Sequence, residues 1–396
     1  MQRAGALEGV RILDLSRVLA GPFCTMMLAD MGAEVIKIEI PVKGDDSRSF
    51  GPFVNGESGY YMNINRNKKG VTLNLKGEGK KLFLKMVEQA DIVVENYRPG
   101  VMEKLGLGYD DLKKYKPDII YGCVSGFGHD GPYSQRPGYD VIGQASSGLM
   151  STTGWPGGEP TRIGTAMADT LAGYSLTIGL LAALRHRDLT GEGQKVDIGI
   201  MDSCVASMQI VYPLYTMGGK LPERIGNRYE SNYPTDSFRV SDGMIVIGAA
   251  NDKLWQKLCE VMGAPELGFD DRFDINPKRV KRHAEIKPII ERWTMARTGE
   301  EAIDTLIKHG VPAMPINNLA QVVDDPHAKA RELFVEVEHP VAGKTLLNNS
   351  HFKMSKTRGR VYEPAPLLGQ HNTEVYKELA GLSEREIEAY RSDGTI

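Results

Sequence analysis

Short apolar runs alternate with segments of helical spacing through the first half of the chain. Five of these runs are typical of buried strands: 11–15 (RILDL), 34–39 (EVIKIE), 71–76 (VTLNLK), 91–96 (DIVVEN) and 119–126 (IIYGCVSG). Segments with the apolar spacing of helices lie between them, the first opened by Pro22, at 23–31, 79–90 and 99–105. Strands that alternate with helices predict an α/β fold with a parallel sheet covered on both faces.

The middle of the chain carries its longest apolar segment, at 166–186. This length predicts a buried helix, and the cationic residues at 185–187 suit its C-terminus. A strand at 195–200 and a helix at 202–215 follow. The preceding tract, 125–165, is rich in glycine and proline and too long for a simple connection, so it is predicted to carry function.

The pattern changes after residue 215. Two alternating runs around Asp242-Gly243 predict a β-hairpin, and helical patterns follow at 252–262, 280–297 and 300–309. Thr298 and Glu301 stand at capping-box spacing before the last of these. We therefore predict four parts: a large α/β domain over 1–215, a linker over 216–227, a small α+β domain over 228–325, and a segment over 326–396 that returns to the large domain.

Composition narrows the class of protein. Hydrophobic residues make up 41% and charged residues 25% of the 396, as in ordinary globular chains. A net charge of −3 without blocks of like charge predicts no binding to nucleic acid or anionic membranes. The N-terminus lacks the apolar run of a signal peptide, and the nearly uncharged stretch 164–184 contains Asp169, so no membrane span is predicted.

Cysteine spacing and the missing motifs exclude several chemistries. The four cysteines form no CxxC pair, which predicts neither a disulfide framework nor a metal site and favours a reducing compartment, the cytoplasm. No GxGxxG follows the first strand and no GxxxxGK occurs, so the usual dinucleotide and nucleoside-triphosphate motifs are absent. GxSxG and HExxH are absent as well.

Asp169 is the only formally charged residue between Arg162 and Arg185. One interpretation is structural: a carboxylate near the start of a helix caps it or favours its positive end. The other is functional: a carboxylate stripped of water is a better nucleophile or base than a solvated one. The residues alone leave both open.

Basic residues gather near the predicted strand ends, where open α/β sheets bind ligands. They could hold phosphate groups, or they could be ordinary solvated surface charges. The set comprises Arg17, Lys43, Arg48, the run 66–69, Arg98, Lys104 and Arg136.

Several motifs together closely resemble the class III CoA-transferase family, which is related to the α-methylacyl-CoA racemases. They are LDLSRVLAGPFCTMMLADMGAEVIKIE, NRNKKGVTLNLK, ADIVVENYRPGVMEKLGL, GFGHDGPY, PGYD and RIGTAMADTLAG, and they span about 9–202, with a looser match to about 327. The resemblance implies a Rossmann-like large domain, a smaller domain and an interlocked homodimer.

The resemblance also implies a reaction. Asp169 would be the nucleophile that attacks an acyl-CoA thioester, giving an aspartyl-acyl anhydride and then an aspartyl-CoA thioester. Coenzyme A would thus enter as a thioester substrate, with no permanently bound cofactor. Succinyl-CoA as donor and a free dicarboxylic acid as acceptor are the preferred pair, with carnitine-like acids as the alternative.

The coenzyme A contacts of the family carry over to positions after the predicted strands: Arg17, Ala20, Leu73, Asn74, Leu75, Lys76, Asn96, Tyr97, Arg98, Lys104, Arg136 and Tyr139. Two departures stand out. Ile40 occupies a position that is often basic in the family, where Lys43 could substitute. The segment 227–234 (NRYESNYP) lacks the glycine-rich loop of formyl-CoA transferases, which argues against oxalate as acceptor.

Two alternatives remain at this stage. A racemase would need a proton-transfer group where this chain has Tyr139, and a phenol with a pKa of about 10 is a poor substitute for imidazole. A noncatalytic coenzyme A-binding protein would have no need for a lone carboxylate in an apolar helix. Replacement of Asp169 by alanine separates a binder from a transferase.

Overall fold

The chain is described here by a computed structural model, which covers residues 5–396 and divides into two compact units. The larger unit comprises the chain up to Leu149 together with 162–217 and 326–396. The smaller unit comprises 150–161 and 218–325. The glycine-rich tract therefore contributes to both units.

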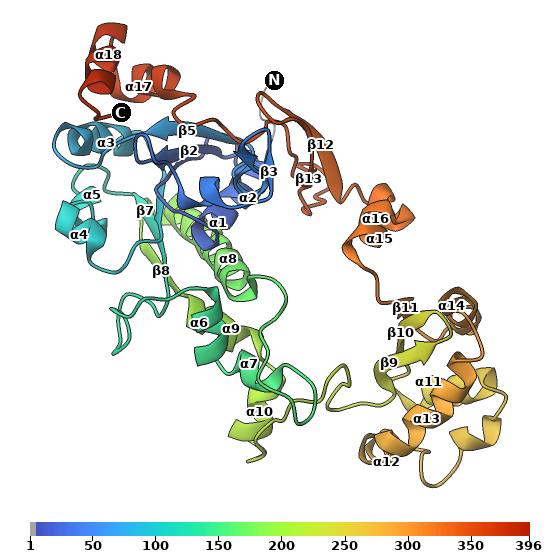
Figure 1. The fold of residues 1–396 in the computed structure, drawn as a ribbon. Helices are drawn as coiled ribbons and strands as arrows, with labels where there is room; N and C mark the ends of the chain where they lie inside the picture. Colours follow the sequence, from blue (N-terminus) through green and yellow to red (C-terminus); the bar gives the residue numbers. More distant parts are fainter. Residues whose placement is uncertain (1–4) are drawn as a thin grey trace. The chain divides into compact units, whose positions relative to one another are not determined.

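A six-stranded parallel sheet forms the centre of the larger unit (Figure 1). Its order is β5 (Lys68–Thr72), β2 (Glu34–Glu39), β1 (Arg11–Asp14), β6 (Ile92–Glu95), β7 (Ile120–Ser125), β8 (Lys195–Gly199). Ile12 of β1 is in register with Val35 on one side and Ile92 on the other. The order changes direction between β1 and β6, which is where such sheets bind ligands beyond their carboxyl ends. The predicted α/β fold with a parallel sheet is confirmed.

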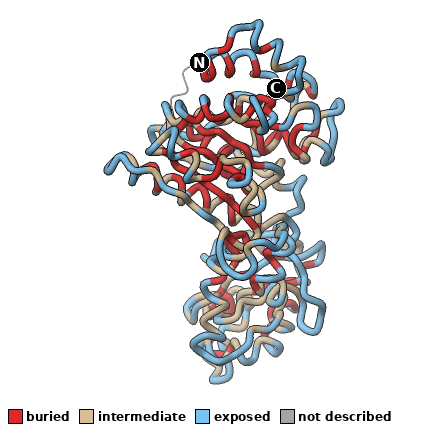
Figure 2. The backbone as a smooth tube through the Cα atoms, turned by 90° about the vertical axis from the view of Figure 1, so that its left-hand side faces the viewer, coloured by how far each residue is buried: buried red, intermediate tan, exposed pale blue. Residues whose placement is uncertain are grey.

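Alternate strand residues build the two cores of this unit, because successive side chains point to opposite faces. Leu13 and Val93 belong to one core, with α3 (Glu78–Val87), α17 (Asn372–Ala380) and α18 (Glu384–Ser392). Ile12 and Val94 belong to the other, with α1 (Ala20–Asp30), α8 (Met167–Thr190) and α9 (Ile200–Ser207). Figure 2 shows buried residues, in red, gathered in the part of the chain that contains both termini.

Helix α8 is the one helix in residues 5–396 that is long and apolar enough to span a membrane, with a mean hydropathy of 1.4. Ala168, Ala172, Leu176 and Leu180 are fully buried and belong to the core that also contains Ile120 of β7. These side chains of α8 are thus buried against the sheet, as is typical of the core helix of a globular protein.

An antiparallel sheet organises the smaller unit. It has the order β11 (Ala313–Pro315), β10 (Gly243–Gly248), β9 (Thr235–Val240), and it packs with α11 (Asp252–Val261), α13 (His283–Thr294) and α14 (Gly299–Lys308). The predicted hairpin is confirmed as β9 and β10. The capping box is confirmed as well: Thr298 and Glu301 satisfy each other's backbone N–H groups.

The remaining elements are short. They are β3 (Phe53–Val54), β4 (Glu57–Ser58), α2 (Gly59–Ile64), α4 (Val101–Leu105), α5 (Tyr109–Leu112), α6 (Asp140–Ser146), α7 (Leu149–Thr152), α10 (Val211–Thr216), α12 (Asn276–Lys281), α15 (Leu319–Asp324), α16 (Pro326–Ala330), β12 (Phe334–His339), β13 (Gly343–Asn348), and the 3-10 turns Asp46–Ser49 and Pro265–Gly268.

Some element boundaries were predicted wrongly. The first helix begins at Ala20, so Pro22 is its third residue rather than its first. The predicted helix at 202–215 is two helices, α9 and α10, and this break puts Pro213 in a first turn, where its missing N–H costs nothing. The predicted helix at 280–297 is interrupted at Arg282, between α12 and α13.

The third strand is also displaced from its prediction. It covers Lys68–Thr72 rather than 71–76. Leu73 still donates its N–H to Glu39 O at 2.7 Å, but the next residue, Asn74, donates to Thr395 O at 2.8 Å. The C-terminal segment therefore takes over the hydrogen bonding where the strand ends.

Candidate active site

A cavity of about 190 Å³ lies beyond the carboxyl ends of β1, β6 and β7, within the larger unit. We call it the Asp169 cavity. Many of the predicted site residues line it: Arg17, Ala20, Asn96, Tyr97, Arg98, Arg136, Tyr139 and Asp169. Residues far apart in sequence meet here because parallel strands bring their carboxyl ends to one edge of the sheet.

The other predicted contacts do not line this cavity. Leu73 is 3% exposed and its side chain belongs to the core, so only its backbone is available to a ligand. Asn74, Leu75 and Lys76 follow β5, which is separated from β6 by β2 and β1, and Lys104 lies exposed on α4. The predicted coenzyme A contacts thus divide into residues that line the Asp169 cavity and residues that lie outside this cavity.

The carboxylate of Asp169 has neither a hydrogen-bond nor an ion-pair partner among residues 5–396. It stands in the first turn of α8 and is half-buried. Burial raises the pKa of Asp169 to about 7, and the nearby negative charge of Asp140 adds to the rise. Helix N-terminal N–H groups oppose this rise. The result is a poorly solvated carboxylate that faces a cavity.

The helix start is capped by Asp140, not by Asp169. Asp140 Oδ1 accepts the N–H of Ala168 at 2.7 Å and that of Asp169 at 3.3 Å. Asp169 therefore does not cap the helix, but it does lie in the first turn, where a negative charge is favoured. The sequence offered no signal for this pair beyond the PGYD motif, since the two residues lie on different segments.

The loop after β1 holds a strained conformation at the cavity. Val18 has a φ of 67°, which is rare for a β-branched residue and often marks a functional site. Asp45 Oδ1 accepts the Val18 N–H at 3.1 Å. Lys37 in turn donates to Asp45 Oδ2 at 2.8 Å and to Ser16 O, and both ionic side chains are fully buried.

The basic residues separate into two groups. Arg17, Arg98 and Arg136 line the Asp169 cavity, so they are available to an anionic ligand. Several others are held by carboxylates: Arg48 by Glu39 at 2.7 Å, Arg66 by Asp30 at 2.7 Å, Lys68 by Asp14 at 3.0 Å and Lys69 by Glu34 at 2.8 Å. Arg66 and Lys68 are thus neither free to bind phosphate nor exposed to solvent. Both predictions for these two residues are wrong.

Lys43 is the residue that could replace a basic side chain at Ile40. Its side chain is largely exposed and pairs with Asp46 Oδ1 at 2.9 Å. Asp46 also lines the Asp169 cavity and pairs with Arg17 at 3.3 Å. An anionic ligand would therefore compete with Asp46 for both cations.

A second, larger hollow lies on the other side of Leu19. Its volume is about 740 Å³, and its lining includes Phe23, Tyr60 and Met62. Leu19 lines both spaces, and Thr165, Ala166 and Thr170 bring this hollow next to Asp169. We call it the apolar hollow. The site thus places the Asp169 carboxylate between an arginine-lined cavity and an apolar space.

The chain is similar to known proteins along nearly its full length. The profile of CoA-transferase family III matches residues 7–372. Human succinyl-CoA:glutarate CoA-transferase is 40% identical over 403 residues, covering 100% of this chain and 91% of that protein. Acetyl-CoA:oxalate CoA-transferase from Acetobacter aceti is 39% identical over 379 residues, covering 95% of this chain and 96% of that protein.

A solved structure supports the same relationship. A CAIB/BAIF family protein from Brucella suis superimposes with a TM-score of 0.85 at 35% sequence identity, covering 95% of this chain and 100% of that one. Full-length matches at this identity establish common ancestry and fold. The chain belongs to CoA-transferase family III and is a CoA-transferase.

Proposed function

We propose that this enzyme moves coenzyme A from succinyl-CoA to a free dicarboxylic acid through covalent intermediates on Asp169. The single observation that carries the proposal is the Asp169 carboxylate, which is half-buried, unpaired among the described residues and in one cavity with Arg17, Arg98 and Arg136. Succinyl-CoA as donor is supported by the activity for which the human relative is named.

The first half of the reaction uses Asp169 as nucleophile. A carboxylate oxygen attacks the thioester carbonyl of the donor, the C–S bond breaks, and coenzyme A leaves as a thiolate, giving a mixed anhydride. The thiolate then attacks the aspartyl carbonyl of that anhydride. The donor acid departs as a carboxylate, and Asp169 becomes a thioester of coenzyme A.

The second half reverses these steps with the acceptor. Its carboxylate attacks the aspartyl thioester, releases the thiolate and forms a second anhydride. The thiolate attacks the acceptor carbonyl, which gives the new acyl-CoA and restores Asp169. No proton or redox equivalent is required, so the reaction needs no permanent cofactor and no base.

We propose positions for the two parts of the acyl-CoA. The phosphates of coenzyme A would meet the guanidinium groups of Arg17, Arg98 and Arg136, because arginine pairs well with phosphate. The acyl group would lie in the apolar hollow, with its thioester carbonyl at Asp169 beside Leu19. The segments 73–76 and Lys104 would contact outer parts of the coenzyme.

The remaining expectations are proposals of the same kind. The order of the six strands supports a Rossmann-like description of the larger unit. The chain leaves that unit at residue 218 and returns at 326, so the smaller unit closes a loop of chain, as an interlocked homodimer requires. Four free, buried cysteines fit a reducing compartment, and we propose the cytoplasm.

Turnover measurements test the proposal. Succinyl-CoA is incubated with a panel of dicarboxylic acids, with oxalate included, and new acyl-CoA is followed chromatographically. Wild-type enzyme is expected to form product, and Asp169→Asn to lose at least about 10³-fold in kcat. An Asp169→Asn variant that keeps wild-type turnover would refute the covalent mechanism.

A further inference from the structure

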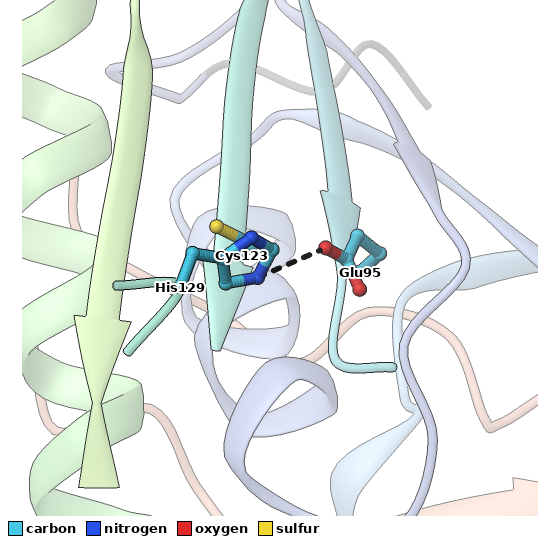
Figure 3. A group of neighbouring side chains, drawn as sticks. All are labelled: Glu95, Cys123 and His129. Atoms are coloured by element: carbon cyan, nitrogen blue, oxygen red, sulfur yellow. Dashed lines mark ion pairs between the residues drawn. The ribbon is translucent and has the colours of Figure 1, made fainter. Parts of the chain in front are cut away.

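Glu95 ends strand β6 just before the Asn96–Arg98 segment, yet it lies outside the Asp169 cavity. The residue is 1% exposed, and its Oε2 accepts the N–H of Tyr97 at 2.7 Å. Figure 3 shows Glu95 facing His129, with Cys123 behind them on the neighbouring strand. The backbone N–H that Glu95 holds is thus part of a segment that lines the cavity.

Two further side chains, those of Tyr121 and His129, lie against the Glu95 carboxyl group from the other side. Tyr121 donates its hydroxyl to Oε1 at 3.2 Å, and His129 Nε2 lies 3.7 Å from the same oxygen. The His129 ring is fixed by Lys195 Nζ, 3.0 Å from Nδ1, and its backbone N–H donates to Asp197 at 2.8 Å. The network therefore connects β6 to β7 and β8.

The atoms of Glu95, Cys123 and His129 also lie close enough to hold a metal ion, all within 4.8 Å of one another. The protonation states of His129 and Cys123 argue against a bound metal ion. The Lys195 ammonium donates to Nδ1, which assigns the ring proton to Nε2, the atom that would have to bind the metal. Burial also raises the pKa of the Cys123 thiol, whereas a metal needs the thiolate. Glu95 and His129 therefore have a structural role, in which His129 packs beside the Glu95 carboxyl group without a hydrogen bond to it.

The supported segment holds the first cavity loop in turn. Asn96 Oδ1 accepts the Arg17 N–H at 2.7 Å, and Asn96 Nδ2 donates to Arg17 O at 2.7 Å. The Arg17 guanidinium lies 5.3 Å from the centre of the Tyr97 ring. A shift of Tyr97 would therefore move Arg17 as well, and both line the Asp169 cavity.

We propose that Glu95 is a positioning residue for coenzyme A: held by Tyr121 and His129, it fixes the Asn96–Arg98 segment and, through Asn96, the loop of Arg17. The inference rests on the proposed coenzyme A site. Glu95 touches no substrate and takes no part in bond making. Its replacement should therefore change the binding of coenzyme A and leave the chemistry at Asp169 intact.

Three variants of the full chain test this, with the Kd of free coenzyme A measured by calorimetry and turnover measured in parallel. Glu95→Leu fills a similar volume without an acceptor, and it should raise Kd and the KM for acyl-CoA about tenfold or more, with kcat within about threefold of wild type. Glu95→Gln keeps an acceptor for the Tyr97 N–H. Since burial raises the pKa of Glu95 to about 8, Gln also resembles the neutral form that prevails at pH 7, and it should recover most of the affinity.

Cys123→Ala is the matched control. Cys123 is fully buried in the same cluster, but its nearest polar atoms are on β8, Val196 O at 3.6 Å and Asp197 Oδ1 at 3.7 Å. The Cys123→Ala substitution should therefore leave the Kd of coenzyme A unchanged. A Glu95→Leu enzyme that folds and binds coenzyme A as tightly as wild type would overturn the proposal. A Glu95→Gln enzyme that binds coenzyme A as weakly as Glu95→Leu would also overturn the proposal.

A second comparison applies if Glu95→Leu does not fold. His129→Ala removes support behind Glu95 and should raise the Kd of coenzyme A about threefold or more relative to Cys123→Ala. Equal affinities of these two variants would overturn the proposal. A wild-type enzyme that fails to bind coenzyme A would instead refute the proposed site, so the two failures are distinguishable.

Discussion

Asp140 and Asp169 illustrate how two carboxylates acquire different roles from their surroundings. Asp140 accepts two helix N–H groups, which suit a negative charge, whereas Asp169 accepts none from the described residues and has a raised pKa. The charge of Asp140 contributes to that rise. The pair therefore sets the pH range in which the Asp169 carboxylate is ionised.

Replacement of Asp140 by asparagine tests this coupling. The Asp140→Asn variant keeps a side-chain oxygen for the Ala168 N–H but removes the charge that raises the pKa of Asp169. The Asp169 carboxylate then persists to lower pH, so the acidic limb of the kcat/KM profile should move to lower pH. An acidic limb that does not move, in a variant that folds and turns over, would contradict the coupling.

The unpaired carboxylate should also lower stability. The folded pKa of Asp169, about 7, lies above the model-compound value of 3.8, so ionisation in the folded state is unfavourable. Stability is lost as the pH rises from about 4 to about 7. Asp169→Asn should therefore raise the thermal midpoint more at about pH 8 than at about pH 4. A stabilisation that is equal at both pH values would argue against a desolvated nucleophile.

At the scale of elements, the strained loop after β1 depends on buried ions. Lys37 holds the pKa of Asp45 well below its usual value, and Asp45 holds Val18. The contribution of this ion pair to the free energy of unfolding is present above the pKa that Asp45 has in the unfolded chain. It is lost as the pH falls below about 4. Asp45→Asn should cost about 3–5 kcal/mol at pH 7, because buried Lys37 loses the carboxylate with which it is paired. Unfolding by denaturant at about pH 7 and about pH 3.5 checks this prediction. The difference in the free energy of unfolding between Asp45→Asn and wild type should be smaller at the lower pH.

The contact between α1 and α8 places Asp169 against the loop of Arg17. A Cβ atom at Gly173 would lie 2.9 Å from Ala20 O and 2.8 Å from Phe23 Cδ1. Gly173→Ala should therefore destabilise the fold by about 1–3 kcal/mol, despite the better helix propensity of alanine. Gly299→Ala in α14, where the nearest atoms are 3.6 Å away, is the matched control. Equal midpoints of the two variants in calorimetry would show that α1 and α8 have room to separate.

Sequence reasoning worked best where one local pattern decides the structure. Uninterrupted apolar runs located most strands of the sheet and helix α8, and Thr298 with Glu301 located a helix start. It failed where the deciding partner lies far away in sequence. Arg66 and Lys68 are buried because Asp30 and Asp14, 36 and 54 residues earlier, pair with them.

The candidate site follows the same rule. The family motifs singled out Asp169 and the residues after β1 and β6, but no local pattern showed that Asp140 caps α8 or that Glu95 holds Tyr97. Both depend on strands and helices that meet only in the fold. The relatives named for glutarate and oxalate are almost equally similar to this chain, so overall similarity does not select the acceptor.

At the scale of the whole molecule, the proposed interlocked homodimer makes a kinetic prediction. Two closed loops of chain that pass through each other cannot separate without unfolding. Differently tagged dimers mixed under native conditions should therefore form no mixed dimer, whereas refolding from denaturant should give about half mixed dimers. Mixed dimers that form under native conditions, or a monomer in sedimentation, would contradict the interlocked assembly.

The central claim is that Asp169 carries the acyl group and coenzyme A in turn. The most direct measurement is peptide mass spectrometry of the enzyme incubated with succinyl-CoA and quenched with hydroxylamine, which converts an activated carboxyl group to a hydroxamate. A hydroxamate on Asp169, dependent on succinyl-CoA, is the predicted result. An enzyme that turns over acyl-CoA while Asp169 stays unmodified would contradict the claim, and exchange of α-protons in heavy water would then be the reaction to measure.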